Sequence, residues 1–448
     1  MGGALLQCGI TYPDSITRLT PHVRPMNPRT LLTDSFHAAV GAVDPLKIVA
    51  GHLPAPPKGR TLVVGAGKAA ASMARAVEQV WPAGAALEGL VVTRYAHGMP
   101  TERIRVLEAG HPVPDGAGEQ AAAEILALTA SLTPDDLLIA LVSGGGSSLL
   151  SLPVASVPMA DLKAVTNSLL RSGAPITEMN IVRKHLSRVQ GGRLAAACRA
   201  PVVTLIISDV TGDDPSAIAS GPTCADPSTY GDALDILRRF QVDAPASVLA
   251  HFEAGAAGKI DETPKPGDPS LAHVKNIVIG TPHQSLQAAA EFFRAQHITP
   301  VVLGDTVTGE ATEVAKVYAA LVREIRDHQQ PFRPPVALIS GGECTVTVRG
   351  NGRGGRCVEF LTSLAVELNG LPDVFALAAD TDGIDGTEDN AGALLFPDTV
   401  SRATAKGVSA QKMLANNDGY SYFEALGDLL VTGPTRTNVN DYRVILVL

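Results

Sequence analysis

Six serine and glycine residues follow an apolar run and are the strongest candidate for a ligand-binding loop. The run is 137–142, Leu-Leu-Ile-Ala-Leu-Val, and the loop is Ser143, Gly144, Gly145, Gly146, Ser147 and Ser148. A loop with almost no side chains lets a ligand reach backbone N–H groups, and consecutive glycines can turn several of these groups toward one anion. A plain strand-to-helix connection would not need three glycines, because each costs backbone entropy. We therefore expect Ser143 through Ser147 to cradle the phosphates of a nucleotide.

A second glycine loop carries a lysine. Gly65, Gly67 and Lys68 follow an apolar run and open a helix expected over 68–80, in the G-x-G-x-x-A pattern of dinucleotide-binding loops. The next apolar run ends at Arg94 instead of the acidic residue that would hold a ribose, and the loop does not fit a Walker A sequence. A lysine at a helix N-terminus is unfavourable unless an anion lies there, so Lys68 is a candidate catalytic residue. The alternative is a tight turn with a solvated lysine.

Two aspartate clusters, each at the end of an apolar run, are candidates for a metal or an acid–base site. Asp209 follows 202–208, and Asp382 follows 375–379. Open α/β sheets bind ligands at strand ends, and Mg²⁺ beside phosphates prefers carboxylate oxygens. The alternative is turn chemistry, which also favours Asp and Gly. We expect Asp209 or Asp382 to hold Mg²⁺ or to orient a substrate hydroxyl, and the sequence does not choose between them.

Arginines in and near glycine-rich segments complete the candidate site. Arg353 and Arg356 share the glycine-rich segment 350–356, and guanidinium groups match the geometry of phosphate and carboxylate. We expect Arg356 to stabilise charge during catalysis and Arg353 to hold a substrate carboxylate. Arg183 and Glu343 are further candidates for substrate binding. The alternative for 350–356 is the solvated tip of a hairpin.

The composition bounds the class of protein. The chain has 448 residues, 45% of them hydrophobic and 18% charged, with a formal net charge of −9 that argues against nucleic acid as a partner. The five cysteines are scattered and form no C-x-x-C pair, which argues against a disulfide framework and favours a reduced, cytosolic setting. No apolar run approaches the ~20 residues that span a bilayer. We interpret 1–28 as an irregular extension, or as the product of a start codon placed upstream of Met26.

Apolar runs typical of strands alternate with Ala-rich stretches typical of helices, which indicates an α/β fold with a parallel sheet covered on both faces. The first series has expected strands at 61–64, 89–93, 104–108, 137–142 and 202–208, and helices at 68–80, 118–132, 159–171 and 178–190. After a Gly- and Pro-rich linker over 255–272, a second series has expected strands at 276–280, 299–303, 336–339, 345–349, 374–379, 429–432 and 442–448. We predict one α/β domain at 29–269 and a second, smaller one at 270–448.

Nine motifs in register resemble a known family. They are Gly65-Ala66-Gly67-Lys68, His111-Pro112-Val113-Pro114-Asp115, the loop from Val142 to Ser147, Val182-Arg183-Lys184-His185-Leu186-Ser187, Ser220-Gly221-Pro222-Thr223, Ser340-Gly341-Gly342-Glu343, Gly352-Arg353-Gly354-Gly355-Arg356, Asp380-Thr381-Asp382-Gly383 and Thr437-Asn438-Val439-Asn440-Asp441. In this order they resemble the class II glycerate 2-kinases, the family with a C-terminal MOFRL domain. The likeness runs from about residue 30 to the end of the chain.

The resemblance implies ATP-dependent phosphorylation of D-glycerate to 2-phosphoglycerate with Mg²⁺. It implies a Rossmann-like first domain, a MOFRL-type mixed α/β second domain and an active site in the cleft between them. The family's loop lysine maps to Lys68, and its arginine in the glycine-rich loop maps to Arg356. Members of the family have often been labelled hydroxypyruvate reductase.

Three departures from the family pattern lie near the inferred cleft. The family usually continues its arginine with Asn-Gln-Glu, where this chain has Cys357, Val358 and Glu359. It usually has Lys where this chain has Gln190, and Gly where this chain has Arg436. Each departure changes a polar or a conformational feature.

Two other functions remain open from the sequence. An NAD(P)-dependent hydroxypyruvate reductase would use the Gly65 loop for its dinucleotide and Arg94 to read a 2′-phosphate, but it would leave the arginines of 350–356 and both aspartate clusters unused. A non-catalytic nucleotide or sugar-phosphate sensor would bind without turnover. In each case we expect a small-molecule ligand and no membrane partner, and assembly as a homodimer stays open.

Overall fold

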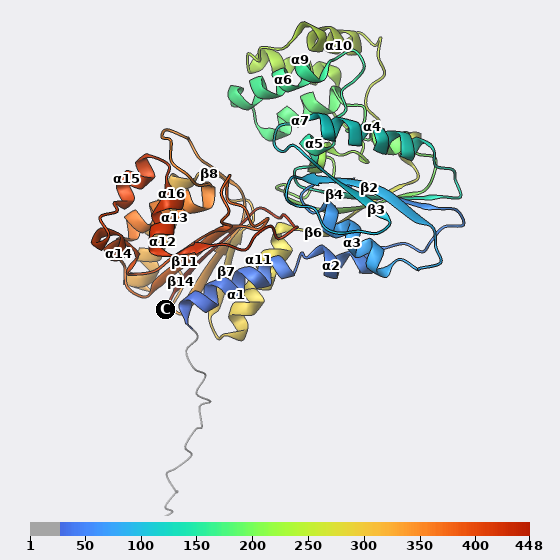
Figure 1. Ribbon diagram of the computed structural model, residues 1–448. Coiled ribbons are helices and arrows are strands. Elements are labelled where there is room, and N and C mark those ends of the chain that lie inside the picture. The colour runs from blue at the N-terminus through green and yellow to red at the C-terminus, as the bar shows by residue number, and fades with distance from the viewer. Residues whose placement is uncertain (1–26) are drawn as a thin grey trace, which may run out of the picture.

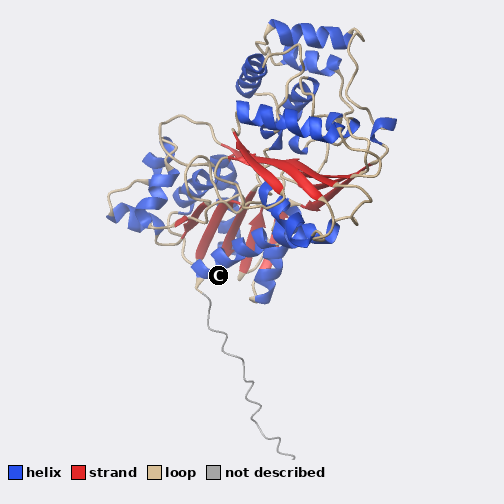
Figure 2. Ribbon diagram, turned by 45° about the vertical axis from the view of Figure 1, so that its right-hand side comes forward, coloured by secondary structure: helices blue, strands red, loops and turns tan. Residues whose placement is uncertain are grey.

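The structure is a computed structural model and describes residues 27–448 of the chain. The segment that the sequence suggests to be an irregular extension lies outside the described residues, apart from its last two positions. Two α/β lobes lie side by side, and a group of helices covers the top of the first lobe in Figure 1. Each lobe is built around one sheet with helices on both faces (Figure 2).

The first lobe contains a parallel six-stranded sheet. Its spatial order is β3 (Ile104–Ala109), β2 (Leu87–Arg94), β1 (Thr61–Ala66), β4 (Leu137–Ser143), β5 (Val202–Ile207) and β6 (Val274–Gly280). This is the strand order of the doubly wound dinucleotide-binding fold. Every residue of β1 and β4 is buried, as expected for central strands with both faces covered. The predicted Rossmann-like parallel sheet is therefore confirmed.

Alternate residues of these strands pack against helices on opposite faces, because successive side chains of a strand point to opposite sides. Val63 packs into a core with α2 (Pro45–Ile48) and α3 (Ala70–Val80). Leu62 and Val64 pack on the other face, with α4 (Gly116–Ala130), α5 (Gly146–Leu149) and α8 (Arg193–Ala196). These two cores fix where the strand ends lie.

The second lobe contains a mixed six-stranded sheet, which confirms the predicted mixed α/β fold. Its spatial order is β13 (Leu429–Leu430), β12 (Gly392–Leu395), β11 (Val374–Asp380), β14 (Asp441–Val447), β9 (Val336–Ser340) and β7 (Thr299–Gly304). One face is covered by α12 (Ala311–His328), α13 (Arg356–Leu368), α14 (Thr399–Ala405), α15 (Ala410–Ala415) and α16 (Gly419–Leu426). The other face is covered by α1 (Pro28–Gly41) and α11 (Pro282–Ala295).

Two segments cross the predicted boundary at 269/270, which itself stays a prediction. The strand expected at 276–280, in the second series, is β6. It pairs with β5 and therefore belongs to the first sheet. Conversely, α1 precedes the whole first lobe in the chain but packs against α11 and the second sheet. Local sequence patterns predict that a strand or helix exists, but they do not say which sheet it joins.

Two other local expectations need correction. The helix expected over 178–190 is α7 (Ile176–His185), and the backbone has already left the helical conformation before Gly191 and Gly192, which adopt positive φ. The strand expected at 345–349 shrinks to β10 (Cys344–Thr345), which pairs only with β8 (Gly309–Glu310). The short strand β12 was not predicted.

A separate helical unit, which we call the cap, rises from the first lobe. It consists of α6 (Met159–Ser172), α7, α9 (Tyr230–Arg239) and α10 (Ala246–Ala256), and these helices share a hydrophobic core around Tyr230 and Phe252. The cap is inserted in two pieces, before and after β5. Among residues 27–448, none of the helices combines the length and the apolar character that crossing a bilayer requires.

Gly255 should be essential to the stability of the cap. A Cβ at this position would lie 2.3 Å from ring atoms of the fully buried Tyr230. We expect Gly255→Ala to lower the free energy of unfolding by about 1–3 kcal/mol, because a packed core resists overpacking. Gly116→Ala is the matched control, because no atom lies within 4 Å of a Cβ built there. Urea denaturation checks both variants, and equal stabilities would contradict the expectation.

Candidate active site

The site forms where the ends of strands from the two lobes face each other. The carboxyl ends of β1, β4 and β5 deliver Lys68, the Ser143 loop and Asp209 from the first lobe. The carboxyl ends of β9 and β11 deliver Glu343 and Asp382 from the second lobe. Ligands of open α/β sheets bind at such ends, so both sheets present their reactive edge to the same space.

A cavity of about 300 Å³ lies at this junction. Side chains from both lobes and from the cap line it. They include Lys68, His111, Gly145, Ser147, Ser148, Leu170, Ile176, Asn180, Arg183, Asp209, Glu343, Arg356, Asn438 and Asn440. Seven of the residues that the sequence predicts for the site therefore lie around one cavity. They are Lys68, Gly145, Ser147, Arg183, Asp209, Glu343 and Arg356.

Lys68 joins the two lobes through a buried ion pair. Its Nζ lies 2.5 Å from Oδ2 of Asp382, and the two side chains are 13% and 1% exposed. Burial alone would lower the pKa of Lys68, but the charges of Asp382 and Asp380 outweigh burial and raise it. The lysine is thus a permanent cation at the cavity wall. Asp382 itself does not line the cavity, and its carboxylate is taken up by Lys68 and by the backbone N–H of Ile384.

Arg356 is the first residue of α13, so the alternative of a solvated hairpin tip does not apply to it. Three carboxylates hold its guanidinium, each at 2.7 Å: Asp441 at Nε, Glu343 at Nη1 and Asp380 at Nη2. Burial would lower the pKa of Arg356, but these carboxylates raise it well above its usual value. Glu343 is the most exposed of the three, at 54%, so an incoming anion can most easily replace it.

Asp209 is held by two asparagines of the other lobe. Asn438 donates from Nδ2 to the Asp209 carboxylate at 3.1 Å, and Asn440 donates to the Asp209 carbonyl at 2.7 Å. Burial raises the pKa of Asp209 to about 6, and the positive charge of Lys68 only partly offsets this effect. The carboxylate has no cation in direct contact among the described residues, which leaves it suited to receive one from a ligand.

In the two glycine loops, some residues line the cavity and others allow the loops to pack closely against their neighbours. Gly145 and Ser147 face the cavity. A Cβ at Gly144 would lie 1.9 Å from the Asp209 carboxylate, and one at Gly146 would lie 2.5 Å from Ala219. These two glycines permit close packing and do not line the cavity.

The remaining residues of the predicted cradle hold the first lobe together. A Cβ at Gly65 would lie 2.2 Å from the Leu141 carbonyl of the neighbouring strand. Gly67, at φ +140°, lies directly against Ser143. The Ser143 hydroxyl accepts a hydrogen bond from the N–H of Ala69 at 3.0 Å, at the start of α3. These three residues position Lys68, and the structure does not bring them to the cavity wall.

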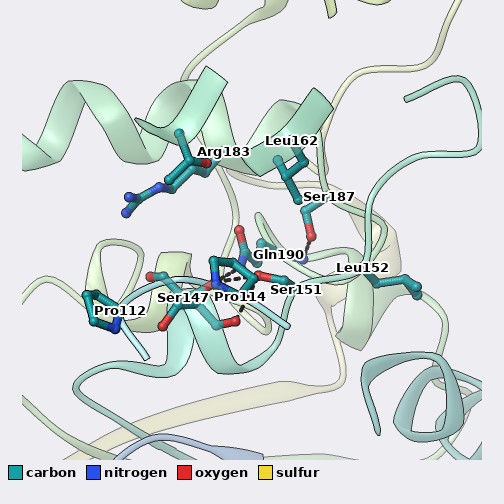
Figure 3. Close-up of a pocket in the computed structure, with 11 residues that line it drawn as sticks. Pro112, Pro114, Ser147, Ser151, Leu152, Leu162, Arg183, Ser187 and Gln190 are labelled. Carbon is teal, nitrogen blue, oxygen red and sulfur yellow. Dashed lines mark hydrogen bonds between the residues drawn. The ribbon is translucent and has the colours of Figure 1, made fainter. Parts of the chain in front are cut away.

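The two predicted substrate arginines differ in position. Arg183 projects from α7 over Pro112 and Ser147, beside a narrow pocket of about 20 Å³ that adjoins the main cavity (Figure 3). Its guanidinium has no carboxylate partner among residues 27–448, and burial lowers its pKa. Arg353 instead pairs with Glu388 at 2.5 Å and stacks over the ring of Tyr420. Arg353 therefore does not reach the cavity, contrary to the role the sequence suggested.

Sequence reasoning missed several cavity residues. His111 lines the cavity, and burial together with the nearby charge of Lys68 lowers its pKa to about 3, so its imidazole is neutral. Asn438 and Asn440 lie in a polar loop that by sequence alone is also consistent with a long turn. The position of this loop could have indicated its role, because it directly precedes the expected last strand. The first residue of that strand, Asp441 of β14, contacts Arg356.

The three departures from the family pattern have local structural explanations. Gln190 donates from its amide to the carbonyls of Ser147, at 2.8 Å, and Leu150, at 3.2 Å, and so supports the loop beneath the cavity (Figure 3). Cys357 and Val358 are fully buried in the core of the second lobe. Arg436 adopts φ +59°, a conformation that glycine reaches at lower cost, and its Nε donates to the carbonyl of Gly98 in the first lobe.

Two α/β lobes that place cations from both sides around one cavity suit a phosphotransferase, because catalysis of phosphoryl transfer is mostly positioning and charge stabilisation. Residues 31–253 match the family described as a domain of unknown function, DUF4147, and residues 336–441 match the MOFRL family. The chain is 39% identical to a glycerate 2-kinase of Pyrococcus horikoshii, covering 87% of this chain and 88% of that protein. It is also 49% identical to an Agrobacterium vitis protein named "Putative hydroxypyruvate reductase", covering 94% of each chain.

The crystal structure of a glycerate kinase from Thermotoga maritima superposes with a TM-score of 0.82 at 36% identity, covering 94% of this chain and 99% of that one. The chain belongs to the class II glycerate 2-kinase family, with a C-terminal MOFRL domain, and it is an enzyme of the glycerate kinase type.

The Lys68–Asp382 pair should contribute to stability as well as to the site. Lys68→Met leaves a buried carboxylate without its cation, and we expect it to lower the free energy of unfolding by about 3 kcal/mol. Adding Asp382→Asn should recover part of that loss, because the unpaired charge is then gone. Urea denaturation of the two single variants and the double variant measures the coupling.

Lys316→Met is the matched control for this cycle. Lys316 pairs with Glu313 at the surface, where the two side chains are 50% and 65% exposed, so the change should cost much less than Lys68→Met does. A Lys68→Met loss no larger than the control loss would show that the buried pair does not stabilise the fold.

Proposed function

We propose that this protein transfers the γ-phosphoryl group of ATP to the 2-hydroxyl of D-glycerate, with Mg²⁺, and yields 2-phosphoglycerate and ADP. The observation that carries the proposal is the approach of Lys68 and Arg356, one from each lobe, to the same cavity. The glycerate kinase names of the relatives support the same reaction.

Lys68 and Arg356 would neutralise the transferring phosphoryl group. Lys68 stays charged, and the carboxylates around Arg356 fix the direction of its guanidinium. Preorganised cations stabilise the charge of the transition state without having to reorient during the reaction. Gly145 and Ser147 line the cavity beside Lys68 and are the candidates to contact the nucleotide phosphates. The other residues of the predicted cradle would act by holding this loop in place.

The carboxylates at the cavity fit a magnesium ion that is shared with phosphates. Asp209 and Glu343 both line the cavity, one from each lobe. Within the described residues no group of three or more metal-binding side chains occurs. This suits Mg²⁺, which is usually held by one or two carboxylates together with substrate phosphates. A magnesium ion bound there would neutralise phosphate charge. Asp382 would pair with Lys68 and would not bind the ion.

Arg183 would hold the carboxylate of glycerate. It lines the cavity, has no carboxylate partner among the described residues, and offers the paired donors that bind a carboxylate at two points. Such an arrangement would place the substrate between the cap and the first lobe. The neighbouring hydroxyl would then attack phosphorus as the bond from phosphorus to the ADP oxygen breaks. A loose transition state does not need a strong base, because the hydroxyl proton leaves late.

The purified protein should form ADP and 2-phosphoglycerate only when ATP, D-glycerate and Mg²⁺ are all present. A coupled ADP assay and the ³¹P spectrum of the product check this expectation. Lys68→Ala and Arg356→Ala should each lower kcat about 1,000-fold, because each removes a cation from the transferring phosphate. Oxidation of NADPH with hydroxypyruvate, and no ADP from glycerate, would instead establish the reductase.

The proposed role of Arg183 and the absence of such a role for Arg353 can be distinguished by the KM for D-glycerate of the two variants. Arg183→Ala should raise the KM for D-glycerate on the order of 10- to 100-fold, the loss expected for a charge-assisted hydrogen bond, with little change in the KM for ATP. Arg353→Ala should leave both values near those of the unmodified protein, because Arg353 lies outside the cavity. Initial rates at varied substrate concentrations check both variants. A glycerate defect confined to Arg353→Ala would restore the assignment suggested by the sequence.

A further inference from the structure

A second cavity, of about 260 Å³, lies in the second lobe and shares Arg356 with the main cavity. It is lined by Cys344, Val346, Val348, Gly352, Gly354, Gly355, Arg356, Glu359, Gly386 and Asn417. None of these residues except Arg356 has a part in the reaction described above. We propose that this cavity binds the adenine base of ATP, an inference that rests on the proposed function for the position of the phosphates.

Glu359 gives the cavity its polar recognition group. The residue is 3% exposed, and one carboxylate oxygen accepts a hydrogen bond from Nδ2 of Asn417 at 2.9 Å. The other oxygen has no hydrogen-bond partner among residues 27–448, and no cation is paired with the carboxyl group there. Burial raises the pKa of Glu359, and the bond from Asn417 only partly offsets this effect. An acceptor oxygen that lines the cavity without a donor from the described residues can take a hydrogen bond from a ligand, so the cavity is suited to a ligand with an amino group.

Asn417 holds this recognition group in a fixed place. Its side-chain oxygen accepts hydrogen bonds from the N–H groups of Arg349, at 2.7 Å, and Gly350, at 3.1 Å. One amide side chain therefore connects the loop that carries Val348 with the carboxyl group of Glu359. A rigid acceptor of this kind can distinguish an amino group from a carbonyl at the same position of a ring.

The other walls are suited to a flat apolar ring. Val346 and Val348 offer apolar carbon atoms, and Val348 is 75% exposed. Glycines form much of the remaining wall, so a ring can approach the backbone closely. A larger residue would not fit at Gly355, because a Cβ there would lie 2.2 Å from the Asp385 side chain.

The spacing along α13 links this cavity to the reaction. Arg356 and Glu359 are three residues apart, so they lie on the same side of the helix and about one turn, ~5 Å, apart along its axis. A base near Glu359 would be separated from the transferring phosphoryl group, held by the tip of the Arg356 side chain, by the ribose and two phosphates. The nucleotide would then extend from the second lobe toward Lys68, and the space beneath the cap would remain for glycerate.

The cap offers a competing place for the base. Leu170 and Ile176 line the main cavity and are 51% and 53% exposed. Exposed apolar side chains are common on protein surfaces and do not need a ligand, whereas Glu359 offers the second cavity an oriented acceptor oxygen that takes no hydrogen bond from the described residues. The second cavity is therefore favoured, and the cap becomes one outcome of the test.

Calorimetric titration with ATP, inosine triphosphate and inorganic tripolyphosphate tests the proposal on the full chain with Mg²⁺. Inosine triphosphate has a carbonyl where ATP has the amino group, and tripolyphosphate has no base. We expect the unmodified protein to bind ATP about tenfold more tightly than inosine triphosphate, a difference of one good hydrogen bond. Glu359→Gln presents an amide donor, and we expect it to reverse this preference while leaving the affinity for tripolyphosphate unchanged.

Val348→Ser is the second variant, because the side chain is exposed and its replacement does not disturb the core. We expect it to weaken binding of both nucleotides about threefold and to leave tripolyphosphate binding unchanged. Ile176→Ala in the cap should leave all three affinities unchanged. The proposal is overturned if Glu359→Gln keeps the preference for ATP, or if Ile176→Ala alone weakens nucleotide binding. A failure of the proposed function is seen separately, as normal nucleotide binding without phosphorylation of glycerate.

Discussion

The structure depends on a group of buried charges that neither lobe could hold alone. Lys68 projects from the first lobe into carboxylates of the second, and Asp209 receives hydrogen bonds from two asparagines of the second. A buried charge is costly unless a partner compensates it. The ends of the two sheets are therefore held face to face by the same groups that line the cavity, and the geometry of the site and the contact between the lobes have one common cause.

The centre of the first sheet could be predicted closely from sequence because β1, β4 and β5 are almost continuously apolar and each is followed by a glycine or a polar residue. Lys68, Asp209 and the Ser143 loop lie at such ends, and local patterns were enough to place them. Other features depend on contacts between distant segments. Nothing near 276–280 shows that β6 joins the first sheet, and nothing in α1 shows that it packs on the second.

The two arginines of 350–356 show the same limit at the level of single residues. Both lie in a glycine-rich stretch, and composition does not distinguish them. In the structure Arg356 begins a helix and meets three carboxylates, whereas Arg353 turns toward Glu388 and Tyr420. The partners of Arg356 come from the loop after β9, the end of β11 and the start of β14, whereas those of Arg353 come from the loop after β11 and from α16. Only the assembled fold separates the two roles. The departure at Gln190 was visible in the sequence, but its contacts with the Ser147 loop were not.

The exchange of α1 and β6 between the lobes means that the chain passes from one lobe to the other at two neighbouring places. One crossing follows α1 near Val43, and the other follows β6 at Gly280, where a Cβ would lie 3.5 Å from the Val43 side chain. All six strands of the first sheet therefore lie in one continuous stretch of chain between the two crossings, whereas the second lobe is assembled from both ends of the sequence. A gene fragment that began at the MOFRL half would lack α1 and would expose the apolar face of its sheet, so that half is not an independent cassette for domain shuffling.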